Sequence, residues 1–65
     1  MEVVELLLVT DRSVFVNTAK VVTLEDASTP ENGEATLITF EHSHTITVRG
    51  DIDTVAFKLF PSGIR

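Results

Sequence analysis

The amino-acid sequence predicts a single α+β domain over residues 1–65: a small, twisted antiparallel sheet of four or five strands with one C-terminal helix packed on one face. Three observations lead to this fold class. A chain of 65 residues has room for only one domain. Val, Ile and Thr supply 22 of these residues, and β-branched side chains pack well on a pleated sheet. A helical apolar period replaces the strand patterns only after Gly50.

Turn residues divide the first part of the chain into candidate strands. The first two candidate strands, both rich in apolar residues, cover positions 3–10 and 14–17 and are separated by a polar cluster at positions 11–13. A third strand is expected over positions 20–25, with a bend or bulge at positions 18–19 before it. The second and third strands are alternatively one bent strand.

The next part of the chain predicts a β-hairpin. The connection at positions 26–34 contains a Pro, which has no N–H for a ladder, and an Asn-Gly pair that suits positive φ. Residues 35–41 and 45–49 each alternate between two faces, and the outer face is rich in Thr. The polar segment 42–44 has the length of a hairpin turn, so we expect antiparallel pairing of these two strands.

After Gly50 the sequence predicts a helix. Asp51 occupies the N-cap position, because a carboxylate there accepts a hydrogen bond from a free backbone N–H. Pro61 ends the helix. About ten residues are too few for a helix to be stable alone, so this helix must dock on the sheet. Its apolar face comprises Ile52, Val55, Ala56, Leu59 and Phe60.

Apolar side chains on both faces of the N-terminal strands predict self-association. A domain of this size buries only about 60% of its unfolded surface, and one short helix covers one sheet face. Either the sheet curls into a barrel around its own core, or a second subunit covers the spare face. We expect a homo-oligomer, with a two-fold dimer favoured; the alternative is a monomer with exposed aliphatic side chains. The interface is expected at Leu6, Leu8, Phe15 and Phe57.

His42 and His44 form the one constellation that resembles a metal site. Alternate residues on a strand project to one side, so the two imidazoles could converge, joined by Glu41 or a carboxylate of another subunit. Zinc takes three or four protein ligands, and the chain has no third His and no Cys. We therefore expect two solvated turn residues and no bound metal or cofactor. The alternative is a metal- or pH-responsive module.

No pattern in the sequence predicts catalysis. The carboxylate pairs Glu25-Asp26 and Asp51/Asp53 lie where a loop and a helix begin, which explains them as turn and cap residues. No Ser lies in a nucleophile-elbow motif, and the three Gly are isolated, so no loop is built to cradle phosphate. The chain is not expected to be an enzyme.

The charge of the chain argues against nucleic acid as a partner. Ten acidic residues outnumber five scattered basic ones, which gives a net charge of -5. Such a surface suits a basic protein partner better. The alternative is a small DNA-associated regulator whose dimer brings together Arg12 and Arg49 of both copies.

The apolar N-terminal segment is not expected to be a signal peptide or a membrane span. Glu2 is its first charged residue, where a signal peptide has a basic region. The segment is interrupted by Glu5 and is far shorter than the roughly 20 residues that cross a bilayer. The chain also has no Cys for disulfides, so we expect a cytoplasmic protein without membrane contact.

Several short motifs carry a resemblance: Val16-Asn17, Val21-Val22-Thr23-Leu24-Glu25, Thr36-Leu37-Ile38-Thr39-Phe40, Thr47-Val48-Arg49 and Ile52-Asp53-Thr54-Val55. With them the chain resembles the small flagellar FlbD-type proteins along nearly its whole length. The turns at positions 11–13 and 42–44 depart from the Asn-Gly-type turns of that family. The resemblance implies a small bacterial accessory or regulatory protein without catalytic residues. The expected function is a non-catalytic interaction module that self-associates and contacts another protein.

Overall fold

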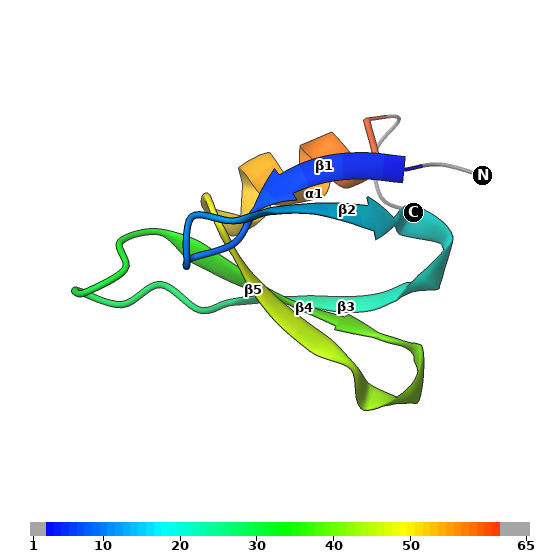
Figure 1. Ribbon diagram of the computed structural model, residues 1–65, viewed down its shortest axis with the longest axis horizontal. Coiled ribbons are helices and arrows are strands. Elements are labelled where there is room, and N and C mark those ends of the chain that lie inside the picture. The colour runs from blue at the N-terminus through cyan, green and yellow to red at the C-terminus, as the bar shows by residue number, and fades with distance from the viewer. Residues whose placement is uncertain (1–2, 62–65) are drawn as a thin grey trace.

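A computed structural model describes residues 3–61 and confirms the α+β class, with strands first and one helix at the C-terminal end (Figure 1). The strands lie close to their predicted positions, and a 3₁₀ turn separates the second from the third. The elements are β1 (Val3–Leu7), β2 (Ser13–Asn17), η1 (Thr18–Lys20), β3 (Val21–Asp26), β4 (Ala35–Phe40), η2 (Glu41–Ser43), β5 (Thr45–Arg49) and α1 (Ile52–Leu59).

The five strands form two antiparallel sheets, β1-β2 and β3-β4-β5, so the prediction of one sheet of four or five strands was wrong. β1 pairs along its whole length with β2, from Val3↔Asn17 to Leu7↔Ser13. It meets β5 only just beyond its end, at the bridge Leu8↔Val48. The hairpin then diverges from β5, and the two sheets lie over each other with α1 beside them (Figure 1).

The core lies between the inner faces of the two sheets and the helix. The β1-β2 hairpin contributes Leu6 and Val16, and the three-stranded sheet contributes Ile38 and Val48. α1 packs against β3 and β4 and closes one side of this core. Its buried side chains are Val55 and Leu59.

The placement of Leu6 at an exposed interface was wrong, because Leu6 is only 5% exposed and lies in the core. Leu8, on the same side of the strand, is half-buried and packs against the core. Glu5 lies on the opposite face and is exposed. A carboxylate is costly to bury, so the face that carries Glu5 points to solvent, although Val3 and Leu7 share it.

A β-bulge in β3 changes which side chains face the core. The register with β4 shifts between Val21 and Thr23. Val21 and Leu24 both pack against the core as a result, whereas Val22 is exposed.

α1 begins and ends where the sequence predicts. Asp51 is the N-cap: its carboxylate accepts hydrogen bonds from the Thr54 hydroxyl at 2.6 Å and the Thr54 N–H at 3.4 Å. At the other end, Phe60 is the C-cap, and its N–H donates to the Ala56 carbonyl. Pro61 follows directly and cannot continue the helix.

Gly50 connects β5 to α1 in a conformation that L side chains rarely adopt. Its φ is +111°, and a Cβ there would lie 3.4 Å from Cγ2 of Val55. Its N–H donates to the Glu34 carbonyl at 3.0 Å, and its carbonyl accepts from the buried Thr36 hydroxyl at 2.9 Å. These bonds hold the tight turn that places the helix on the sheet.

We expect Leu59→Ala to lower the free energy of unfolding by about 2–5 kcal/mol, because it removes a buried side chain and leaves a cavity. Lys58→Ala, on the exposed side of the same turn, should change it by less than about 0.5 kcal/mol. Urea titration followed by circular dichroism measures both. Equal losses in the two variants would contradict the packing of α1.

We expect Gly50→Ala to lower the free energy of unfolding by about 1–3 kcal/mol, because its backbone conformation is strained for any residue with a Cβ. Gly33→Ala is the matched control. Gly33 also has a positive φ, +73°, but in the more accessible left-handed region, and a Cβ there meets no atom within 4 Å. Thermal unfolding should therefore show a smaller loss for Gly33→Ala; the reverse order would contradict the role of Gly50.

Candidate functional site

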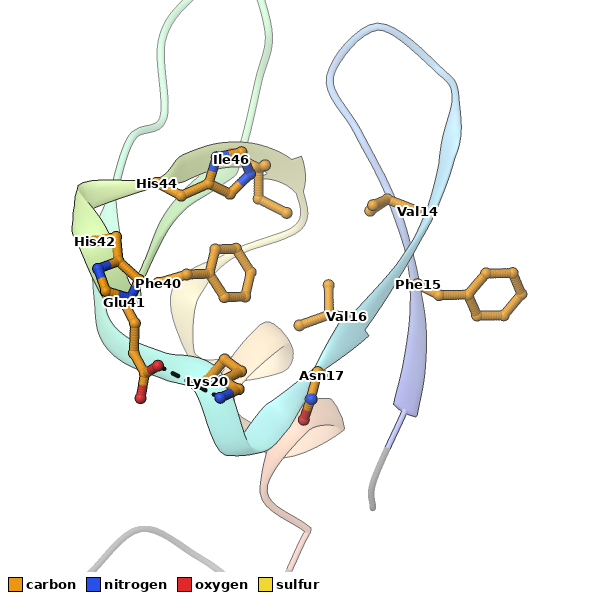
Figure 2. A pocket seen from close by; sticks show the side chains of 10 residues that line it. All are labelled: Val14, Phe15, Val16, Asn17, Lys20, Phe40, Glu41, His42, His44 and Ile46. Atoms are coloured by element: carbon orange, nitrogen blue, oxygen red, sulfur yellow. Dashed lines mark hydrogen bonds and ion pairs between the residues drawn. The ribbon is translucent and has the colours of Figure 1, made fainter.

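A groove of about 430 Å³ opens between β2 and the tip of the β4-β5 hairpin (Figure 2). Side chains of Val14 and Val16 point into it from β2, opposite Phe40 and Ile46 of the three-stranded sheet. Its polar lining comes from η1 and the β4-β5 turn and includes Asn17, Lys20, Glu41, His42 and His44. The site is thus an apolar floor between two sheets with a polar rim.

The groove exists because the helix covers only part of the space between the sheets. α1 has eight residues and packs against β3 and β4. Phe40 and Ile46 are only half-buried, as is Val14 on the facing hairpin. The inner faces of the two sheets therefore stay accessible where no helix reaches.

Residues in the left-handed region form the tip of the β4-β5 hairpin. His42 and Ser43 have φ values of +66° and +62°. The Phe40 N–H donates to the His44 carbonyl at 2.7 Å and closes the turn. The His44 ring lies next to the Phe40 ring, with centroids 5.8 Å apart. This contact places an imidazole on the groove's rim.

Both His42 and His44 line the groove, as a pair on one turn. Among residues 3–61, no group of three or more His, Cys, Asp or Glu side chains lies close enough together to hold a metal ion. Two imidazoles fall short of the three protein ligands of a zinc site. The pair instead contributes hydrogen-bonding groups to the rim.

Lys20 and Glu41 form an ion pair at one end of the groove, with Nζ and Oε1 3.5 Å apart (Figure 2). Both side chains are more than half exposed, so water screens the pair. The contact joins η1 to the β4-β5 turn across the groove. It marks where the groove ends and adds at most about 1 kcal/mol to stability.

Arg49 joins three segments that are distant in the sequence. Its Nε donates to the Asp11 carboxylate at 2.8 Å and its Nη2 to the Val9 carbonyl at 2.8 Å. Its Nη1 donates to the Asn32 carbonyl at 3.3 Å. The guanidinium is thus engaged within the chain rather than presented beside Arg12 for a phosphate backbone. This role could not be predicted from the sequence, since nothing local relates position 49 to position 11.

The outer face of the β1-β2 hairpin carries an exposed apolar patch. Phe15 is 70% exposed and lies directly across from Glu5. Val3 and Leu7 are its diagonal neighbours on β1, and both are exposed. We call Val3, Leu7 and Phe15 the hairpin patch. Of the predicted interface residues, Phe15 lies here, whereas Phe57, 68% exposed, lies on α1.

No known protein family matches the chain, and no curated protein or solved structure is significantly similar to it. Among residues 3–61, α1 is the sole α-helix and is too short to cross a bilayer.

Hydrogen bonds lower the pKa of two carboxyls outside the groove. The Thr54 hydroxyl, by donating to Asp51, holds the pKa of this N-cap below its ordinary value of 3.8. The Ser28 hydroxyl and then its backbone N–H do the same for the pKa of Asp26, at the start of the long loop. Both bonds favour the charged form, and both stabilise a local chain reversal.

We expect the unfolding free energy to fall in acid, partly through Asp51. Its pKa is lower in the folded than in the unfolded chain, so its stabilising contribution is present above pH 3.8 and is lost as the pH falls through the folded value. Asp51→Asn should therefore show a shallower loss of stability below pH about 4 than the parent chain. Urea titrations across this range test it; identical pH profiles would contradict the N-cap assignment.

Proposed function

We propose that this protein is a non-catalytic interaction module that self-associates into a homo-oligomer, with a dimer favoured, and contacts a further protein. The single observation that carries the proposal is the hairpin patch. Phe15 is 70% exposed and lies diagonally across from two other exposed apolar residues, Val3 and Leu7. An exposed aromatic side chain next to other exposed apolar residues is typical of a protein–protein interface.

Burial of this patch between two copies would favour association. A buried Phe side chain removes about 150–250 Å² from water, at about 25 cal/mol per Å². In a two-fold interface every such contact occurs twice. Two copies of Phe15 and their apolar neighbours would therefore supply several kcal/mol before the entropic cost of association, which is of similar size. A modest, concentration-dependent dimer is the expected result.

The composition of the groove supports a binding role rather than a catalytic one. Of the residues between positions 3 and 61 that line it, none is a Ser, Thr or Cys that could act as a nucleophile. Lys20 and Glu41 are paired with each other. The apolar floor and hydrogen-bonding rim suit a protein segment. The resemblance to flagellar FlbD-type proteins agrees with an accessory or regulatory role, and we propose a cytoplasmic location.

Light scattering after size-exclusion chromatography tests this proposal. The parent chain should show a mass above that of one chain, which rises with protein concentration. Phe15→Lys should shift it to the single-chain mass, because it puts a charge at the centre of the patch. Thr23→Lys, at an exposed position of β3, is the matched control and should leave the oligomer intact.

Circular dichroism must show that both variants remain folded, as expected for exposed positions. A single-chain mass for the parent protein at millimolar concentration would overturn self-association. Equal dissociation of both Lys variants would show that the hairpin patch has no special part in it.

A further inference from the structure

The two sheets in the described part of the molecule have four outer edges, at β1, β2, β3 and β5. The edge of β1 carries the charged Glu5 at its centre, and charged side chains discourage edge pairing. Two of the other three edges are blocked. β3 is bulged at Val22 and ends in Glu25 and Asp26, devices that keep an edge from pairing. β5 receives a hydrogen bond at Thr47 from the Val9 N–H, at 3.2 Å, so β1 covers part of it. The outer edge of β2 has neither a bulge nor a covering strand.

The hydrogen-bond pattern of the hairpin shows which groups this edge presents. The Leu8 N–H donates to the Arg12 carbonyl at 2.8 Å, so these opposed residues bond across the hairpin. Antiparallel pairs alternate between bonded and non-bonded. Val14 and Val16 therefore direct their backbone groups toward β1, and Ser13, Phe15 and Asn17 direct theirs away from it. Within residues 3–61, no backbone hydrogen bond between separate elements reaches Ser13 or Phe15, whereas the Asn17 carbonyl accepts the first hydrogen bond of η1 as its N-cap.

β2 also carries nothing that would repel a second strand. The segment Ser13–Asn17 contains no charged residue and no Pro. Four of its consecutive residues, Val14 to Asn17, line the groove. The Phe15 side chain points away from the groove while Val14 and Val16 point toward it, so the inner face of β2 borders the groove (Figure 2).

We propose that the occupant of this edge is β2 of a second copy, paired antiparallel about a two-fold axis at Phe15. This inference rests on the proposed self-association and names its surface. The axis pairs Phe15 with its own copy, Val14 with Val16 of the second copy, and Ser13 with Asn17 of the second copy. This register uses the backbone groups of Ser13 and Phe15 and the N–H of Asn17, which face the edge. The result is a continuous four-stranded sheet, β1-β2-β2-β1.

The same arrangement involves both uncovered apolar regions. On the outer side, the two Phe15 side chains become directly opposed neighbours and pack against each other, while Val3 and Leu7 of each copy remain on the open face of the joined sheet. On the inner side, Val14 and Val16 of the second copy lie along the mouth of the groove. One pairing therefore joins the two Phe15 side chains and narrows the groove.

The charge of the chain permits this pairing. The nearest like charges on the outer face are the two Glu5 carboxylates, each directly across its own hairpin from Phe15. They would lie three strand spacings apart, about 14 Å. This exceeds the Debye length of about 8 Å at physiological salt, so their repulsion is screened. Pairing through the acidic end of β3 would instead bring Glu25 and Asp26 together.

Crosslinking tests the register directly, because the chain contains no Cys of its own. In the double variant Ser13→Cys/Asn17→Cys, the thiol at position 13 of one copy faces the thiol at position 17 of the second copy. The Cα atoms of a bonded antiparallel pair are about 5.5 Å apart, within the range that a disulfide spans. Mild oxidation of the full chain should convert most of it to a covalent dimer.

Each single variant is a matched control. Two copies of position 13, or two of position 17, would be offset by four residues, or about 14 Å, so neither Ser13→Cys nor Asn17→Cys should crosslink efficiently. The same offset keeps the two thiols of one chain from joining. Non-reducing electrophoresis, with circular dichroism as a check of folding, gives the readout.

Three outcomes are informative. A double variant that crosslinks at least tenfold faster than both single variants supports the β2 pairing. An oligomeric parent chain whose double variant crosslinks no faster overturns this pairing but leaves self-association standing. The third outcome is that crosslinking is efficient only when a partner protein with a single Cys in an extended segment is added. This result would show that the edge takes a foreign strand, and it would also overturn the proposal.

Discussion

The constraint that shapes this molecule is how little apolar surface 65 residues can enclose. Six buried side chains form the core cluster, two from each of the hairpin, the three-stranded sheet and the helix. A domain of this size leaves a large share of its surface exposed, and an eight-residue helix closes only one side of the space between two sheets. The opposite side remains open as the groove, with β2 as its free margin.

Fold and proposed function are connected through this open side. Because β1 leaves β5 after a single bridge, the sheets do not merge into a closed barrel, and β2 is left without a neighbour on one edge. Arg49 fixes the position of the β1-β2 turn next to β5, because it binds Val9 and Asp11 beyond the end of β1. The groups exposed are backbone donors and acceptors next to aliphatic and aromatic side chains. That combination binds extended protein segments, and it needs no catalytic group.

Much of the local structure follows from the sequence, and the long-range arrangement does not. Asp51, Pro61 and the spacing of Val55 and Leu59 predicted the helix correctly, because caps and periodicity are local. The faces of the strands were harder to predict. Glu5 alone distinguishes the two faces of β1, and Leu6 was wrongly expected on the exposed face. The division into two sheets, the groove and the contacts of Arg49 depend on residues up to 40 positions apart, which no local pattern relates. His42 and His44 were correctly singled out as neighbours on a turn, but their position beside Phe40 and the groove required the fold.

The central claim, that the open side is covered by a second copy along β2, is tested most directly by amide hydrogen exchange at Phe15. The N–H of Phe15 faces the free edge, whereas that of Val16 faces β1, so the two neighbours report on different partners. Measured by NMR at low and at high protein concentration, exchange at Phe15 should slow markedly as the concentration rises. Exchange at Val16 should be slow throughout. A Phe15 amide that exchanges equally fast at every concentration, in a protein whose Val16 amide is protected, would contradict the account.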